Sequence, residues 1–339
     1  MSNININVVS EASGAFNELF GKIQVPLASF IEERFKKGRE NCIALSLFDE
    51  RKSNNFAEGY GGLGAAPALK PVGEGEDYPS MTVEKRALQM IENFVFKGEV
   101  QLTREIVDDA KGDLKIVLSR MGANRLPDSY YKTIELLCGG LLTAAMLGQD
   151  AFTFGGKVFS TKAYDGKKVF ATNHSIGGKT YCNAFTNAFS ADILSKLSER
   201  QQNCPDESGS PAGYTPDTIV IPNDGGAKKE VFAAIGADKD PATANNAFNY
   251  HFGMWNVIVD PYLNGAVSGG KFPFILLDSK YNKDADGNIF QNRVDLEITS
   301  KKDEKTDNNV WRAYSRFSAG FVDFGHMMLG GAGFGTTLS

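Results

Sequence analysis

The longest helical pattern in the chain runs from Thr103 to Gly148, where apolar residues recur every three or four positions. We expect Thr103 to be the N-cap of the first helical part. Pro127 interrupts the pattern, and Asp128 is the expected N-cap where it resumes. These helices together predict a long backbone for the molecule.

Alternating apolar and polar positions predict strands in much of the remaining chain. The clearest alternation places Val294, Leu296 and Ile298 on one face of a strand, and the pattern continues through Trp311 after a charged turn. The short apolar runs TIVI, NVIVD and FILL predict further strands, while Ser190 is the expected N-cap of a short helix. Long strands with few helices predict an α+β fold.

Residues 49–80 form a glycine- and proline-rich segment without an apolar period. Such a segment is either a linker or an extended two-stranded arm. Phe94 and Phe96 alternate in the β-prone stretch that follows, which favours the arm. Residues 1–48 also lack the length to build a core of their own, so we expect them to pack on something else, such as another subunit.

Composition excludes several classes of protein. The chain has 339 residues, 42% of them hydrophobic and 23% charged, which is ordinary for a folded protein of more than one lobe. A net charge of −5 argues against strong direct DNA binding. The four cysteines lack CxxC spacing, which argues against a zinc ribbon and a disulfide scaffold. We find no signal peptide or membrane span in the sequence, because the run LLCGGLLTAAMLG is well below about 20 residues.

His174 and Cys182 lie in the stretch KKVFATNHSIGGKTYCNAF and are the main candidates for chemistry. A catalytic thiolate needs a nearby imidazole, and a metal site needs further ligands. His251 and His326 are remote in the sequence. We favour a polar turn in which His174 satisfies local backbone groups and Cys182 is a small buried side chain, so we expect no catalytic and no metal-binding residues.

The segment NKDADGNIF resembles part of a calcium loop, with Asn282, Asp284 and Asp286 at the first, third and fifth positions. Arg293 stands where the bidentate glutamate belongs, so a hairpin turn is the favoured interpretation. The glycine-rich GYGGLGAAP lacks the GK[ST] of a phosphate loop. No nucleophile elbow, HExxH or dinucleotide fingerprint is present, and we expect no cofactor.

The order of these segments resembles the major capsid proteins of tailed bacteriophages, with the Hong Kong 97-type fold, and in particular the branch of Mu-like head subunits. The segments that carry the resemblance are LTREIVDD before the long helix, VFATNH after it, NVIVDPYL, and VDLEITSKKDEKTDNNVWRAYSRFSAGFVDF near the end. The match extends from about Leu102 to Phe324. The stretch NHSIGGKTYCN departs from the shorter HGN pattern of the family.

The resemblance implies five parts of the chain. They are an N-terminal arm (1–48), an extended loop (49–102), a peripheral domain with the spine helix (103–204), an axial domain (205–280), and strands that return to the peripheral domain with the C-terminus (281–339). The extended loop would reach over a neighbouring subunit, and the axial domain would meet its copies at the symmetry axes.

The same resemblance implies a structural protein and not an enzyme. The expected function is self-assembly into pentamers and hexamers that form an icosahedral head shell around phage double-stranded DNA, without sequence-specific binding. The expected partners are copies of the chain, a separate scaffolding protein, a portal and decoration proteins, with no membrane, in a virion assembled in the bacterial cytoplasm. The alternatives are an encapsulin-like compartment shell and a thiol- or metal-dependent hydrolase that uses His174 and Cys182.

Overall fold

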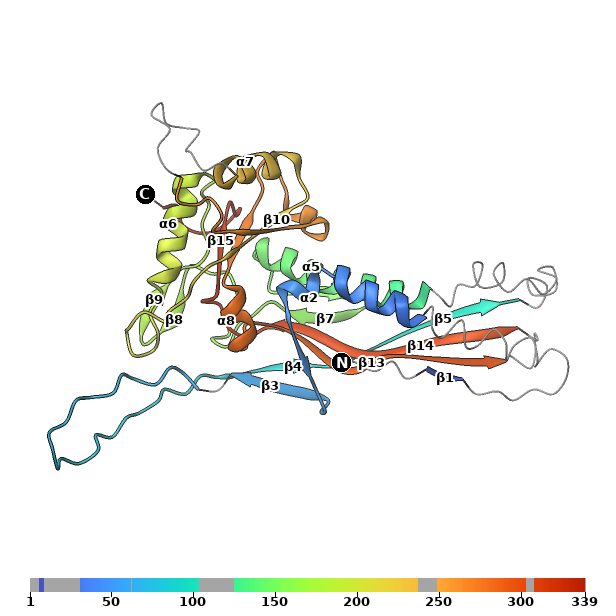
Figure 1. The fold of residues 1–339 in the computed structure, drawn as a ribbon, viewed down its shortest axis with the longest axis horizontal. Coiled ribbons are helices and arrows are strands. Elements are labelled where there is room, and N and C mark those ends of the chain that lie inside the picture. The colour runs from blue at the N-terminus through green and yellow to red at the C-terminus, as the bar shows by residue number, and fades with distance from the viewer. Residues whose placement is uncertain are drawn as a thin grey trace.

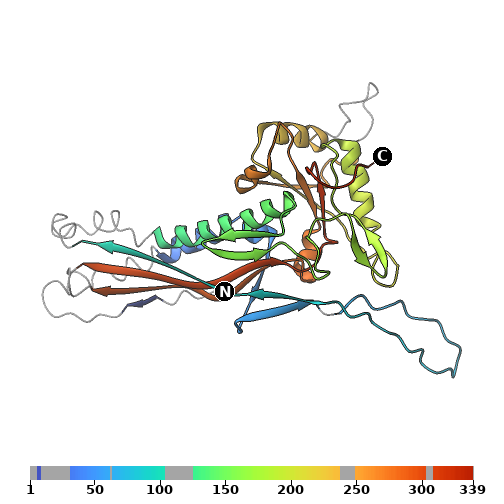
Figure 2. The same ribbon diagram turned by 180° about the vertical axis from the view of Figure 1, so that it is seen from behind.

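The computed structural model describes residues 6–8, 31–61, 63–103, 125–236, 249–302 and 308–338. Within these residues the chain forms an α+β fold with one long sheet, a second sheet in a compact lobe, and a loop that projects away from both (Figure 1). The same arrangement is visible from behind in Figure 2.

The long sheet is built around an antiparallel pair of strands near the C-terminus. Its strands are β13 (Asn288–Lys302), β14 (Asn309–Phe321), β5 (Phe94–Leu102), β1 (Ile6–Val8) and β2 (Asp49–Lys52). β14 lies between β13 and β5 and is antiparallel to both, while β1 and β2 run parallel to β13. Leu296 and Ile298 are buried and Val294 is half-buried, although register shifts interrupt the pairing near Val294. The alternation read from the sequence is therefore confirmed for this strand.

Helix α5 (Leu126–Met146) lies along this sheet and packs against β14 and β13. Its N-cap is Arg125, so the expected cap at Asp128 is wrong: Asp128 lies in the first turn. The helix begins at Leu126, and Pro127 is accommodated because a proline in the first turn loses no helical hydrogen bond. The expected helix after Thr103 falls in residues 104–124, outside the described residues.

Residues 31–41 are helical and are followed by α2 (Ala44–Leu47). Phe35 is buried against Tyr130 and Tyr131 of α5, with ring centroids 5.9 and 5.2 Å away. Glu135 of α5 accepts hydrogen bonds from the backbone N–H groups of Ile43 and Ala44. This part of the expected arm therefore packs on helix α5 of its own chain, while the helical pattern expected before it lies outside the described residues.

The second sheet has the strand order β11 (Asn256–Asp260), β10 (Thr218–Pro222), β12 (Phe274–Leu277) and β15 (Met327–Gly330). β10 and β11 are parallel, and the other pairs are antiparallel. The three strands expected from TIVI, NVIVD and FILL are all present. β15 joins this sheet although it belongs to the last part of the chain, whose strands were expected in the peripheral domain.

Short helices and hairpins surround the two sheets. They are α6 (Ala191–Gln202), α7 (Gly225–Ile235), α8 (Ser279–Asp284), the 3-10 helix η2 (Pro261–Ala266), and the pairs β3–β4 (Ala57–Gly61, Leu88–Glu92), β6–β7 (Ala151–Phe154, Lys157–Ser160) and β8–β9 (His174–Ile176, Lys179–Tyr181). Ser190 caps α6 as expected, because its side chain accepts a hydrogen bond from Ile193 N–H.

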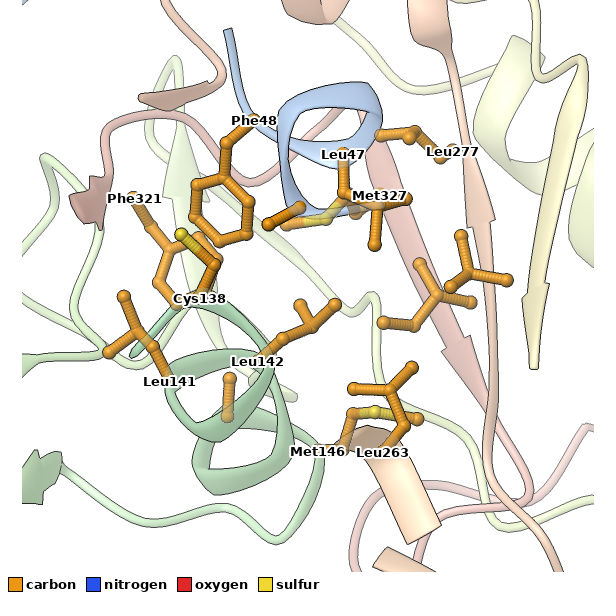
Figure 3. Packing of buried hydrophobic residues seen from close by; sticks show 14 of the residues in the cluster. Leu47, Phe48, Cys138, Leu141, Leu142, Met146, Leu263, Leu277, Phe321 and Met327 are labelled. Carbon is orange, nitrogen blue, oxygen red and sulfur yellow. The ribbon is translucent and has the colours of Figure 1, made fainter. Parts of the chain in front are cut away.

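The two sheets share one hydrophobic core, which is continuous where α5 meets the second lobe. Figure 3 shows Leu47 and Phe48 beside the α5 side chains Cys138, Leu141 and Leu142, with residues of η2, β12 and β15 close by. Because this junction is closely packed, the two lobes are joined by burial and not only by the connecting chain. No helix in the described part of the chain is long and apolar enough to cross a membrane.

Candidate functional site

The projecting loop between β3 and β4 is the most exposed apolar surface among the described residues. Residues 63–87 contain no helix or strand, and the loop extends away from the body in both views (Figure 1, Figure 2). Its side chain at Tyr78 is fully exposed, and Leu69 is 84% exposed. Since a folded chain gains stability by covering such side chains, this loop is a candidate contact surface. β3 and β4 pair as the two-stranded arm expected from the sequence.

An ion-pair cluster lies at the base of the loop. Arg86 Nε donates a hydrogen bond to Glu207, and its NH1 lies 3.3 Å from Asp323 Oδ2. Glu207 also accepts a hydrogen bond from the backbone N–H of Ala65, at 3.0 Å. The guanidinium of Arg86 stacks on the ring of Tyr164, 4.7 Å from its centroid. The cluster connects both ends of the loop to the body.

Electrostatics keep this cluster ionised although it is largely buried. Burial opposes the ionisation of Asp323, but the Arg86 charge and hydrogen bonds from Phe324 N–H and Tyr281 outweigh burial and lower the pKa of Asp323. Burial also opposes the ionisation of Glu207, and its hydrogen bonds with Arg86 and Ala65 N–H lower its pKa. Nothing in the local sequence pattern indicates this cluster, because Arg86 is separated from its partners by 121 and 237 positions.

His174 and Cys182 do not form a catalytic pair. His174 Nδ1 lies 2.7 Å from Asp165 Oδ2, and the imidazole stacks on Phe324 with centroids 3.7 Å apart. The Cys182 thiol donates to Ala184 O and contacts Thr336 Oγ1, and no hydrogen bond joins it to His174. The expected hydrogen bonds from His174 to local backbone groups are wrong, because the imidazole bonds to the Asp165 carboxylate instead. Burial of Cys182 is as expected.

Asp165 and His174 form a buried polar pair that stabilises the local fold. Burial opposes the ionisation of Asp165, but the hydrogen bond and charge of His174 outweigh it and lower the pKa of Asp165. Asp165 Oδ1 also accepts from Lys167 N–H in the Asp165–Gly166 turn. The pair thus connects this turn to β8 and, through the stacked ring, to Phe324 in the segment after β14.

The other two histidines have unrelated partners. His251 Nδ1 accepts a hydrogen bond from Trp255 Nε1, and His326 Nε2 lies 3.0 Å from Asn288 Oδ1. Burial lowers the pKa of His326 to about 4. Across the described ranges, no group of three or more histidine, cysteine or acidic side chains could hold a metal ion.

The calcium-like segment is occupied by contacts within the protein. The Asn282 amide accepts from Asn288 N–H at 2.6 Å and donates to Leu47 O at 3.1 Å. Asp286 has a positive φ of 44° and lies 3.5 Å from an Arg51 nitrogen. The expected hairpin turn is wrong in detail, because the segment begins inside α8, and a turn at residues 285–287 joins that helix to β13.

A second exposed apolar surface was not identified from the sequence. It comprises four half-exposed side chains on α7 and just before β11: Phe232, Tyr250, Phe252 and Met254. They lie in the lobe of the second sheet, away from the projecting loop (Figure 1). Scattered apolar residues on a surface are common, but four large ones in two short segments indicate a contact surface.

Comparison with solved structures identifies the fold. The capsid of Ralstonia phage GP4 is similar to this chain with a TM-score of 0.50 at 10% identity, and the match covers 85% of this chain and 88% of the other. The chain has a Hong Kong 97-type fold. At this identity the likeness establishes the architecture of this α+β chain, with the spine helix α5 lying along the long sheet.

Two other solved structures are similar to the chain with lower scores. The capsid of an empty GTA particle has a TM-score of 0.48 at 12% identity, covering 88% of this chain and 91% of the other. A virus-like particle from Pyrococcus furiosus has a TM-score of 0.44 at 9% identity, covering 89% and 96%. No family model matches the chain. No curated protein matches it either.

Proposed function

We propose that this protein is a major capsid protein that self-assembles into pentamers and hexamers and forms the icosahedral head shell of a phage. The observation that carries the proposal is the projecting loop of residues 63–87, whose apolar side chains are exposed on a Hong Kong 97-type fold. The hydrophobic core does not extend beyond the base of the loop, so Leu69 and Tyr78 remain exposed to solvent. Contact with a second copy of the chain would bury these side chains.

The parts of the chain take their roles within this proposal. Residues 49–102 are the extended loop that reaches over a neighbour, with 63–87 as its projecting portion. Residues 205–280 are the axial domain, which meets its copies at the symmetry axes, and the four exposed apolar side chains on α7 and before β11 support this role. Residues 1–48 are the arm and residues 103–204 the peripheral domain. Residues 281–339 supply its returning strands, apart from β15, which pairs with β12 in the second sheet.

The proposal also covers the family branch, the enclosed DNA, the location and the further partners of the protein. The chain belongs to the branch of Mu-like head subunits, encloses double-stranded DNA without reading its sequence, and acts as a structural protein in the virion after assembly in the host cytoplasm. Its further partners are a scaffolding protein, a portal and decoration proteins. The separate partners of His174 and Cys182 support a protein without thiol catalysis.

Electron microscopy of the purified protein tests the proposal, with and without a co-expressed scaffolding protein. We expect icosahedral shells, or separate pentamers and hexamers. A uniform monomer of 36.8 kDa under both conditions would contradict it. Shells that contain a packaged protein cargo and no DNA in their native source would point instead to a bacterial compartment.

A further inference from the structure

Both ends of the projecting loop meet at one carboxylate. Ala65 N–H donates to one oxygen of Glu207, and Arg86 Nε donates to the other. Gly64 N–H also donates to Glu84 O at 2.8 Å, which pairs the two ends directly. Glu207 itself belongs to the loop that follows α6, so it holds the entry and the exit of the projecting loop against the body.

Arg86 extends this connection to the long sheet. Its second nitrogen faces Asp323, two residues beyond β14, and its plane stacks on Tyr164. Asp323 is held by Tyr281 OH at 2.9 Å and by the backbone N–H of Phe324. Charge-assisted hydrogen bonds of this kind fix direction as well as distance, because the guanidinium is planar.

Beyond these contacts the loop is unsupported within the described chain. The hydrogen bonds within residues 66–83 are a local pair between Gly73 and Glu76. A cavity of about 380 Å³ opens beside the cluster, lined by Leu63, Arg86 and Tyr164 among others. The loop base therefore has both a fixed anchor and adjacent space into which it could turn.

We propose that Glu207, Arg86 and Asp323 form a latch that fixes the angle at which the projecting loop leaves the body. The latch presents the loop to the neighbouring copy in one direction, and its release permits the loop to turn about its base. This role rests on the proposed capsid function, since it supplies the reason for a fixed loop direction. Arg86 and Glu207 act as positioning residues and do not themselves contact the neighbour.

The latch can be tested on the free subunit by measuring the loop direction. All four native cysteines are buried, so spin labels can be attached selectively at introduced cysteines. We choose Tyr78→Cys near the loop tip and Lys229→Cys on the exposed side of α7. Pulsed electron paramagnetic resonance then reports the distribution of distances between the tip and the body.

We expect a single narrow distribution in the parent protein and one at least twice as broad after Arg86→Met. Glu207→Gln removes the charge but leaves Arg86 paired with Asp323, so it keeps the fold intact and should broaden the distribution to an intermediate degree. Arg312→Met is the matched control, because it removes an exposed arginine–glutamate pair on β14 and β5. Equal widths in the parent, Glu207→Gln and Arg86→Met proteins would overturn the latch.

Assembly provides a separate readout. If the parent protein forms shells, the two latch variants should form several-fold fewer closed shells than Arg312→Met at equal concentration. Unchanged closed-shell yields in folded latch variants would contradict a role in assembly. If the parent never assembles, the capsid proposal fails, while the distance measurement still decides whether the latch fixes the loop.

Discussion

At the scale of single residues, His174 shows how a candidate catalytic group becomes a structural one. The imidazole is fully buried between the Asp165 carboxylate and the ring of Phe324. A nucleophilic Cys182 would need that imidazole within hydrogen-bond reach, but its thiol bonds to Ala184 O instead. Both side chains are therefore used to fix the segment between the Asp165 turn and β9.

Asp260 is a buried carboxyl group whose titration should affect stability. It is buried at the end of β11, where it accepts a hydrogen bond from Tyr262 N–H and caps η2. Burial raises the pKa of Asp260 from 3.8 to about 6, despite that hydrogen bond. The folded state therefore binds this proton more tightly than the unfolded state, so the contribution of Asp260 to stability should fall as the pH rises from about 4 to 6.

Replacing the carboxyl group by an amide should remove this loss of stability. Asp260→Asn keeps an oxygen that can accept from Tyr262 N–H and carries no charge. We expect its free energy of unfolding to exceed that of the parent by about 1–3 kcal/mol at pH 7 and to match it near pH 4. Urea unfolding at both pH values measures the difference.

Asp224→Asn provides the control for this measurement. Asp224 also caps a helix with its carboxylate, by accepting from Ala227 N–H at the start of α7, but its side chain is only half-buried. Asparagine and aspartate are similar caps, so a change of at most about 0.5 kcal/mol is expected. A difference in unfolding free energy between Asp260→Asn and the parent that is the same at pH 4 and pH 7 would refute the assignment to Asp260.

At the scale of elements, α5 depends on two adjacent glycines for close packing. A Cβ at Gly139 would lie 2.5 Å from the Cβ of Tyr262 in η2, while one at Gly140 would meet the far end of the Phe152 ring. η2 cannot move away without disturbing the junction core, whereas the half-buried Phe152 ring can turn. A side chain at Gly139 would therefore clash with η2, whereas one at Gly140 could be accommodated.

Gly139→Ala should destabilise the protein by about 1–3 kcal/mol through this overlap, although alanine favours a helix by about 1 kcal/mol over glycine. Gly140→Ala is the matched comparison and should be closer to neutral. Thermal and urea unfolding of both variants measure the effect. A Gly139→Ala protein as stable as Gly140→Ala would show that α5 and η2 are not held this closely.

At the scale of the whole molecule, the projecting loop gives a prediction about assembly. Free subunits should be cut rapidly by chymotrypsin after Leu69 and by trypsin after Lys85, because both residues are exposed in a segment without secondary structure. Shells should be cut there at least about tenfold more slowly if a neighbour covers the loop. Mass spectrometry of the fragments over time measures the rates.

Shells dissociated in mild urea serve as the control, since they should regain the cutting rate of free subunits. Equal rates in intact shells and free subunits would show that the loop is not an intersubunit contact. That outcome would leave shell formation possible through other surfaces, such as the exposed side chains at Phe232 and Phe252.

Elements with local signals could be predicted from the amino-acid sequence. The cap at Ser190, the paired faces of β13, and the three short strands of the second sheet all follow from neighbouring residues, because periodicity and capping act within a few positions. The exposed loop could also be predicted, because a glycine- and proline-rich segment without an apolar period has no hydrophobic face to bury. The order of these segments also sufficed for the resemblance to a Hong Kong 97-type fold.

Only the tertiary structure decided which distant residues meet. Glu207 and Asp323 reach Arg86 across 121 and 237 positions, β15 leaves the long sheet to pair with β12, and Asn282 bonds to Leu47 O instead of a cation. Residues 1–48 were expected to pack on something else, such as another subunit, and their described part at residues 31–48 packs on α5. The physical reason is common to all four: ion pairing, burial and sheet register depend on distances in space, which local sequence patterns do not contain.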